Sequence, residues 1–383
     1  MTTIDDAVLL RRQGRAGRIT LNRPRTINAL THTMVRRIHA ALDAWEHDDA
    51  VTTVVLDGAG ERGLCAGGDV RAVHDDVRAG RGAQAREFWR DEYRLNARIA
   101  AYPKPYVALM DGLVMGGGVG LSAHGGIRVV TERSAVAMPE TAIGFAPDVG
   151  GTYLLSRAPG ELGTHLALTT SRMGPGDAVR AGFADHFVPA ARLQEFAAAL
   201  AVAEPAEAVR AFAAPAPAGE LAAQQDWIDH CYSAGTVEEI LGRLAGSGVA
   251  EAGKAAEAIR GKSPTALKVT LSALRRARRL PGLPEVLEQD YRVICASLAD
   301  PDLLEGIRAQ VVDKDRTPRW APARLEAVTD ADVERLRAGG RRRSRARLTL
   351  PGTGTGTGPG PTAGPGHVPN SCVQYVPARL PVA

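Results

Sequence analysis

Apolar and polar positions alternate with two different periods over residues 1–190. Short segments of strand-like pattern occur at residues 7–10, 18–21 and 52–56. Residues 31–46 instead have helical spacing, which places four apolar side chains on one face: Met34, Ile38, Leu42 and Trp45. A further helix is expected from residue 86 until the prolines at 103 and 105 end it. Strands and helices that alternate in this way predict an α/β fold.

The strand pattern is lost after residue 190. Residues 190–221 are rich in Ala, Pro and Glu, which suggests helices joined by linkers, and residues 222–335 have helical periodicity. We therefore expect one domain over residues 1–190 and a second, helical domain over 191–337. Residues 338–383 contain much Gly, Pro, Thr and Arg and few core-forming residues, so a disordered tail is expected there.

Two glycine-rich corners separate strands from helices. In the first, an apolar strand at 51–58 leads to Ala66, Gly67 and Gly68, and Asp69 is placed to cap a helix that begins near Val70. In the second, the strand YVALM (106–110) is followed by Gly116, Gly117 and Gly118 before a helix expected from about residue 120. Backbone N–H groups at two such corners can form an oxyanion hole.

The same glycines also fit two different roles. Each corner alone is typical of an ordinary strand-to-helix turn in an α/β protein. Residues 118–123 in addition fit the dinucleotide-binding pattern G-x-G-x-x-A, with Glu140 about twenty residues further on. We disfavour a dinucleotide site because several residues separate the end of the strand from the glycines, whereas that pattern needs a tight turn directly after the strand.

Two carboxylates follow the second corner, in MPETAIGFAPDVGG (138–151). Glu140 and Asp148 are both candidates for general acid or base chemistry. From these residues alone, the favoured interpretation of Glu140 is an acid in the first turn of a helix, and the corresponding structural interpretation of Asp148 is a turn or cap residue. Cys65 has no recognisable histidine partner, so a thiol nucleophile is not favoured.

Composition and charge exclude several classes of protein. The 383 residues are 45% hydrophobic and 23% charged, as in ordinary globular proteins. The net charge of +4 is due largely to arginines between residues 335 and 347, and no aromatic platform for nucleic acid accompanies them. No leader or apolar stretch of eighteen residues is found, and four scattered cysteines predict neither disulfides nor zinc. We expect a cytoplasmic protein without nucleic-acid, membrane or metal partners.

Four motifs occur together in this chain: LNRPRTINALTHTM (21–34), CAGGDV (65–70), KPYVALMDGLVMGGGVGLS (104–122) and MPETAIGFAPDVGG (138–151). In combination they resemble the crotonase (enoyl-CoA hydratase/isomerase) superfamily, and within it the 3-hydroxyisobutyryl-CoA hydrolase branch. The resemblance covers residues 19–188 and resumes at SPTALKVTL (263–271) and EGIRAQVVDKDRTPRW (305–320). The resemblance implies a crotonase-type spiral of ββα units followed by a helical domain.

The resemblance also implies roles for individual residues. Backbone amides of Ala66 and Gly117 would form the oxyanion hole, and Glu140 would act as general base or as nucleophile. Asp148 would hold the substrate's 3-hydroxyl group or assist proton transfer. The substrate-binding residues implied are Glu92, Gly116, Gly67, Gly68 and Asp69. Hydratases of this superfamily use a second glutamate, but this chain has Gly120 at that position.

Three functions therefore remain under consideration. The first is hydrolysis of a short 3-hydroxyacyl-CoA, most of all 3-hydroxyisobutyryl-CoA in valine breakdown, with coenzyme A as part of the substrate and no separate cofactor. The second is an enoyl-CoA hydratase or isomerase that uses a single glutamate. The third is an acyl-CoA-binding protein without turnover. A homo-oligomer is possible for each of them.

Overall fold

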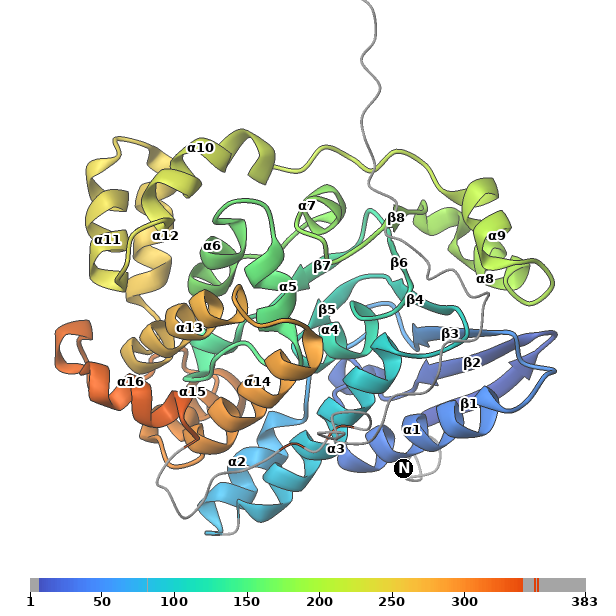
Figure 1. Ribbon diagram of the computed structural model, residues 1–383, viewed down its shortest axis with the longest axis horizontal. Helices are drawn as coiled ribbons and strands as arrows, with labels where there is room; N and C mark the ends of the chain where they lie inside the picture. Colours follow the sequence, from blue (N-terminus) through green and yellow to red (C-terminus); the bar gives the residue numbers. More distant parts are fainter. Residues whose placement is uncertain (1–6, 81, 340–347, 349, 351–383) are drawn as a thin grey trace, which may run out of the picture. The chain divides into compact units, whose positions relative to one another are not determined.

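A sheet with the strand order β1-β2-β3-β4-β6-β8 forms the frame of the fold (Figure 1). The computed structural model describes residues 7–80, 82–339, 348 and 350. Within them, β1 runs antiparallel to β2 and the other neighbours in this sheet are parallel. The strands of the sheet are β1 (Val8–Gln13), β2 (Ala16–Leu21), β3 (Thr53–Gly58), β4 (Tyr106–Met110), β6 (Ile127–Val130) and β8 (His186–Phe187). A smaller parallel sheet pairs β5 (Leu113–Met115) with β7 (Ala135–Ala137).

Helices follow the strands in the first half of the chain and dominate the second half. The first half has α1 (His32–Glu46), α2 (Val70–Arg78), α3 (Ala83–Ala100), α4 (Gly117–Ser122), α5 (Gly151–Arg157), α6 (Leu162–Thr169) and α7 (Pro175–Arg180), with short 3₁₀ turns at Pro24–Thr26 and Glu140–Ile143. The second half has α8 (Leu193–Ala199), α9 (Pro205–Phe212), α10 (Leu221–Tyr232), α11 (Val237–Gly246), α12 (Ala250–Arg260), α13 (Pro264–Ala277), α14 (Leu283–Ser297), α15 (Pro301–Ile307) and α16 (Asp330–Arg337). A π-helical turn, Arg308–Val312, follows α15, and 3₁₀ turns lie at Ala190–Arg192 and Leu325–Ala327.

The early elements form where local sequence signals place them. The Thr31 side chain accepts a hydrogen bond from the Met34 amide and caps α1, whose apolar face is fully buried at Met34, Ile38 and Leu42. Asp69 caps α2 in the same way through the Ala72 amide. Helix α4 differs from the expectation, because it begins at Gly117 and not near residue 120. Its first turn therefore includes the glycines themselves.

Both faces of the main sheet are covered, and the strand pleat divides the side chains between two cores. In β3, Val54 and Leu56 enter the larger core, whereas Val55 faces the opposite side. That opposite side is closed by Phe196 and Leu200 of the α8 region, together with α9. The segment from 190, expected to be linker-rich, thus completes the covering of the sheet. The proposed boundary at residue 190 stays a prediction.

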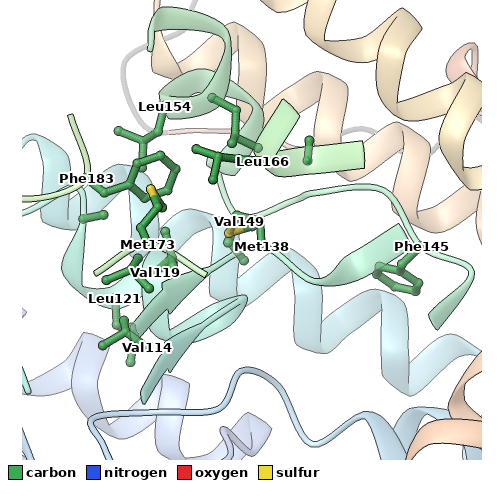
Figure 2. Packing of buried hydrophobic residues seen from close by; sticks show 14 of the residues in the cluster. Val114, Val119, Leu121, Met138, Phe145, Val149, Leu154, Leu166, Met173 and Phe183 are labelled. Carbon is green, nitrogen blue, oxygen red and sulfur yellow. The ribbon is translucent and has the colours of Figure 1, made fainter. Parts of the chain in front are cut away.

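The larger core surrounds α4 and the turns that follow it. Figure 2 shows Val119 and Leu121 of α4 among Val114 of β5, Met138 and Val149. Helices from the second half of the chain pack on the same region: α14 packs on α3 and α5, α13 on α5 and α6, and α15 on α2 (Figure 1). These helices therefore bring distant parts of the chain to the glycine corners.

The structure describes residues 338, 339, 348 and 350 of the segment 338–383, and the prediction of disorder for the others lies outside the described residues. Leu348 and Leu350 are buried and belong to the larger core. The Leu348 amide donates a hydrogen bond to Glu288 of α14 at 2.7 Å. This apolar pair thus adds to the core, which the composition of the segment does not indicate. No described helix is both long enough and apolar enough to cross a lipid bilayer.

Candidate active site

A cavity of about 190 Å³ lies where the two glycine corners meet. Its walls include most of the residues expected to act on substrate: Ala66, Gly67, Gly68, Glu92, Gly116, Gly117, Glu140 and Asp148. Apolar side chains form the rest of the wall and come from α2, α3, the turn after β7 and the α15 region; they include Val73, Trp89, Phe145, Ile307 and Val311. The structure therefore gathers residues separated by more than two hundred positions around one small space.

Backbone pairing between the first corner and β5 brings the two corners together. The Cys65 amide donates to Leu113 O (3.1 Å), and the Met115 amide donates to Cys65 O (2.9 Å). Gly67 has a φ of +104°, and a Cβ atom there would lie 3.3 Å from Met115 O, so glycine suits both the backbone conformation and the close approach. The second corner turns at Gly116, where φ is +49°.

The hydrogen bonds at these corners decide which amides are free. The Ala66 amide donates to Ile27 O at 2.9 Å and is therefore engaged within the loop. The Gly68 amide meets no acceptor in the described part of the chain, and the Gly117 amide is at the first position of α4, where a helix leaves its N–H groups unpaired. A Cβ atom on Gly117 would lie 3.3 Å from Gly68 N, so the two corners are in close proximity. Gly68 thus replaces Ala66 as the candidate partner of Gly117.

Glu140 begins the 3₁₀ turn after β7 and points toward the second corner. It is buried, with its Oε1 atom 3.1 Å from the place where a Cβ on Gly116 would be. Its Oε2 atom has no hydrogen-bond partner among the described residues. Burial, together with the nearby negative charge of Asp148, raises the pKa of Glu140 well above its usual range. A carboxylate with a raised pKa and a free oxygen is suited to accept a proton or to attack a carbonyl carbon.

Asp148 and Glu92 complete an acidic group around the cavity. The Tyr93 hydroxyl donates to Asp148 Oδ2 at 2.6 Å, and burial raises the pKa of Asp148 to about 6 even though that hydrogen bond acts in the opposite direction. Glu92 lies on α3 with a buried Oε1 atom that has no partner in the described ranges. A Cβ on Gly117 would lie 2.5 Å from this atom, and burial raises the pKa of Glu92 well above its usual range.

Position 120, where hydratases of the resembled superfamily have a glutamate, is closed in this structure. A Cβ atom on Gly120 would lie 2.8 Å from both Asn96 Nδ2 and Val149 Cβ. Real Cβ atoms essentially never approach other heavy atoms this closely, so any side chain here would displace its neighbours. The site accordingly presents Glu140 and Asp148 but has no room for a carboxylate at the third position.

Asp69 lies outside the cavity. It caps α2 and forms an ion pair with Arg23 at 3.1 Å, and it lines a separate groove of about 380 Å³ beside α1 and α3. Its expected role in substrate binding at the cavity is therefore not supported by its position. Cys65, at the start of the first glycine corner, is fully buried. Burial raises the pKa of its thiol to about 12, which disfavours a thiolate nucleophile.

Some residues of the site were not anticipated from the sequence. Tyr93 follows Glu92 directly, so its proximity to the site has a local signal, but its bond to Asp148 does not. Ile307 and Val311 reach the cavity from the far end of the chain, and no local pattern identifies them. No group of three or more His, Cys, Asp or Glu side chains in the described ranges is arranged to hold a metal ion.

The geometry and the fold define a class of enzyme that acts on acyl-CoA thioesters. Residues 16–336 match the family model described as enoyl-CoA hydratase/isomerase, and the chain belongs to this family. The predicted crotonase fold is thereby confirmed. Among similar proteins are the mitochondrial 3-hydroxyisobutyryl-CoA hydrolases of Gallus gallus and Homo sapiens, 44% and 42% identical. These matches cover 85% and 87% of this chain, and 87% and 88% of the relatives.

Two solved structures are also close to this chain. A carnitinyl-CoA dehydratase from Mycobacterium thermoresistibile is 53% identical, with a TM-score of 0.87, over 91% of this chain and 99% of that one. An enoyl-CoA hydratase from Rhodobacter sphaeroides 2.4.1 is 49% identical, with a TM-score of 0.82, over 87% of this chain and 97% of that one. The names of the relatives thus agree on acyl-CoA chemistry and differ on the reaction.

Proposed function

We propose that this enzyme hydrolyses the thioester of a short 3-hydroxyacyl-CoA, with 3-hydroxyisobutyryl-CoA of valine breakdown as the foremost candidate. The observation that carries the proposal is the combination of two free amides, Gly68 and Gly117, with Glu140 and Asp148 around one cavity while position 120 is closed. The hydrolase names of relatives at 42–44% identity support it.

The amides would stabilise the negative charge that develops on the thioester oxygen. Loss of one such donor typically costs about 3 kcal/mol of transition-state stabilisation. As a general base, Glu140 would take a proton from water while the water oxygen adds to the carbonyl carbon; the C–S bond then breaks and the proton passes to the CoA thiolate. As a nucleophile, Glu140 would first form an anhydride with release of CoA, and water would then cleave that anhydride.

Asp148 would act beside Glu140 in either mechanism. Because its pKa is raised to about 6, Asp148 is mostly ionised at neutral pH and accepts a hydrogen bond from the Tyr93 hydroxyl. Its role would be to hold the 3-hydroxyl group of the substrate or to assist proton transfer. Glu92, whose carboxyl faces the Gly117 corner, is proposed to contact the substrate as well.

A hydratase or dehydratase is the principal alternative, and the names of the two structural neighbours favour it. Enzymes of the superfamily that hydrate a double bond use two glutamates, and the closed position 120 argues against that arrangement here. A single-carboxylate isomerase remains compatible with Glu140. A protein that binds acyl-CoA without turnover is the third alternative.

One set of assays on a single purified sample separates these functions. Release of free CoA thiol from 3-hydroxyisobutyryl-CoA is expected, without loss of enoyl absorbance from crotonyl-CoA and without gain of it from carnitinyl-CoA. An absorbance change as the dominant activity would establish the hydratase or dehydratase instead. Binding of CoA thioesters with no reaction of any substrate would establish a binding protein. A cytoplasmic location and a homo-oligomer remain expectations of the proposal.

A further inference from the structure

We infer that Asp290, Thr152 and His124 are positioning residues that hold the turn of Asp148, Val149 and Gly150 in its reactive conformation. The inference rests on the proposed function, because it assigns these residues a role through Asp148. It also goes beyond that function, since none of the three lines the cavity. Each consecutive residue of the turn is anchored by a side chain from a different part of the chain.

The backbone of this turn is strained and needs such anchors. Val149 has a φ of +51° and Gly150 a φ of +76°. A positive φ is rare for a β-branched residue such as Val149 and strains its backbone, whereas glycine adopts a positive φ readily. Strained conformations persist where the surroundings determine them, and they concentrate at functional sites. Val149 is fully enclosed and itself lines the cavity beside Asp148.

The first two anchors hold Asp148 and Val149. The Tyr93 hydroxyl from α3 donates to the Asp148 carboxylate at 2.6 Å. His124, just after α4, is 2.8 Å from Val149 O through its Nε2 atom. Burial lowers the pKa of His124 to about 4, so the ring is neutral at physiological pH. Its proton must then be on Nε2, because the carbonyl oxygen of Val149 can only accept.

The third anchor is Asp290 of α14, which holds Gly150 and the start of α5. The Gly150 amide donates to Asp290 Oδ2 at 3.1 Å, and the Thr152 hydroxyl donates to Oδ1 at 2.5 Å. Asp290 is almost completely buried, and a carboxylate in such a place is tolerated only when hydrogen bonds satisfy it. Both of its oxygens are directed at the turn that follows Asp148.

Close packing limits the positions that the turn can adopt. A Cβ atom on Gly150 would lie 2.6 Å from His124 Nε2 and 2.7 Å from Leu283 Cδ1, the first residue of α14. Helix α14 thus contributes both a hydrogen-bond acceptor for Gly150, Asp290, and an apolar side chain that limits the movement of Gly150, Leu283. Since α14 also packs on α3 and α5 (Figure 1), the C-terminal helices determine where the Asp148 carboxylate lies in the cavity.

Asp290 also influences the site by its charge. The groups that face the buried acids from the surrounding elements are Glu92 and Tyr93 on α3, neutral His124 after α4, Glu140, Asp148 and Asp290 itself. Burial raises the pKa of Asp290 itself well above its usual range, and its ionised form is among the causes that raise the pKa of Glu140, after burial and the charge of Asp148. Removal of this charge should therefore lower the pKa of Glu140, which a purely structural role would not predict.

The test compares Thr152→Val with Thr152→Ser in the full-length enzyme. Valine keeps the shape but removes the hydroxyl, whereas serine keeps the hydroxyl. We expect Thr152→Val to reduce kcat about 10²-fold with KM changed less than about threefold, and Thr152→Ser to recover most of the loss, because misplacement of a reacting group by about 1 Å has an effect of this size. His124→Leu and His124→Gln form a second pair with the same expectation, since glutamine retains an N–H donor.

Thr164→Val is the matched control for loss of a buried hydroxyl. Thr164 lies on α6, away from the cavity, and is as buried as Thr152. Its hydroxyl donates a hydrogen bond to the carboxylate of Glu161 at 2.6 Å. We expect Thr164→Val to lower the melting temperature without lowering kcat. Turnover per folded protein is obtained by titrating CoA-binding sites, so partial unfolding of a variant does not obscure the comparison.

Asp290→Asn adds the electrostatic measurement, and Asp148→Asn separates the two proposals. With Asp290→Asn, we expect the acid limb of the kcat profile to move to lower pH as the pKa of Glu140 falls. Equal kcat values for Thr152→Val and wild type, or equal losses for Thr152→Val and Thr164→Val, would overturn the positioning role. If Asp148→Asn retained full turnover, the proposed catalytic role of Asp148 would fail instead.

Discussion

At the scale of single residues, three buried carboxyl groups that line the cavity differ in their hydrogen bonding. Glu140, Asp148 and Glu92 each have a raised pKa, and burial is the largest cause in all three. They differ in their partners, because Asp148 accepts a hydrogen bond from Tyr93, while Glu140 and Glu92 each keep an oxygen without a partner in the described structure. The separate roles proposed for the three acids rest on this difference.

Replacement of Glu140 by glutamine tests its part in the reaction. Glutamine keeps the size of the side chain but is neither a base nor a nucleophile of comparable strength. We expect turnover to fall by about 10²–10⁴-fold while affinity for CoA stays within a few-fold. Steady-state kinetics with 3-hydroxyisobutyryl-CoA and calorimetry with CoA provide the two measurements. More than about a tenth of the wild-type turnover would remove Glu140 from the mechanism.

The raised pKa of Glu140 also predicts how Glu140→Gln changes the pH dependence of stability. The pKa of Glu140 is higher in the folded protein than in the unfolded chain, so the folded state binds more protons and its stability falls as pH rises from the unfolded pKa of about 4.3 toward the folded value. Glu140→Gln removes this loss. We therefore expect its melting temperature to exceed that of wild type at pH 8 by more than at pH 4. An identical difference at both pH values would contradict the raised pKa.

Tyr93→Phe isolates the hydrogen bond to Asp148. The Tyr93 hydroxyl stabilises the ionised form of Asp148, so its loss should raise the pKa of Asp148 above its present value of about 6. If the reaction needs ionised Asp148, the acid limb of the kcat/KM profile should move to higher pH. The profile is measured from pH 5 to 9, with Tyr102→Phe as the control, because the Tyr102 hydroxyl donates to Leu42 O outside the site. A shift to lower pH would refute this account of the hydrogen bond.

At the scale of elements, α4 presents its first amide to the cavity and packs its fourth residue against the Asp148 turn. Gly117 begins the helix, and Gly120 contacts Asn96 of α3 and Val149 so closely that no Cβ atom fits. Glycine therefore serves two different purposes within one short helix. At Gly117 it keeps a free amide accessible, and at Gly120 it allows α3 and the turn to approach.

Gly120→Ala tests the closed position without adding charge. A new methyl group must displace Val149 or Asn96, and overpacking of this kind costs about 1–3 kcal/mol. We expect a lower melting temperature and reduced kcat, since the Asp148 turn moves with Val149. Gly126→Ala is the control, because a Cβ there meets no atom within 4 Å. A fully stable and active Gly120→Ala enzyme would show that position 120 can accommodate a side chain, and would reopen the hydratase alternative.

At the scale of the whole molecule, the site depends on contacts between the two halves of the chain. Ile307 and Val311 close the cavity, Asp290 holds the Asp148 turn, and α13 and α14 pack on α5. The described residues up to Leu350 form one compact unit, so the helices after residue 190 belong to the same unit as the strands that carry the glycine corners. The buried pair Leu348 and Leu350 extends this unit beyond α16.

Two truncations test how far the folded unit extends. A chain that ends after Gly339 loses both buried leucines, and loss of a buried leucine side chain typically costs about 2–5 kcal/mol. We expect a clearly lower melting temperature for this chain and an unchanged one for a chain that ends after Leu350, because the composition of residues 351–383 predicts no core. Scanning calorimetry of the two truncated chains and of the full-length protein provides the melting temperatures for this comparison. Equal stability of the two truncated chains would show that the leucine pair is dispensable.

The sequence by itself determined the elements and the chemical character of the site. Thr31 and Asp69 cap their helices as the sequence predicts, because turn and helix signals act between residues that are near in sequence. Glu140 and Asp148 were identified by the resemblance of their motif to the crotonase superfamily and not by a local structural signal. Only the tertiary structure showed that the Ala66 amide is engaged, that Asp69 faces away and that Asp290 reaches the Asp148 turn. Direction, burial and hydrogen-bond partners depend on segments far apart in the chain, such as Gly150 and Asp290, which are 140 residues apart, and local patterns do not encode such contacts.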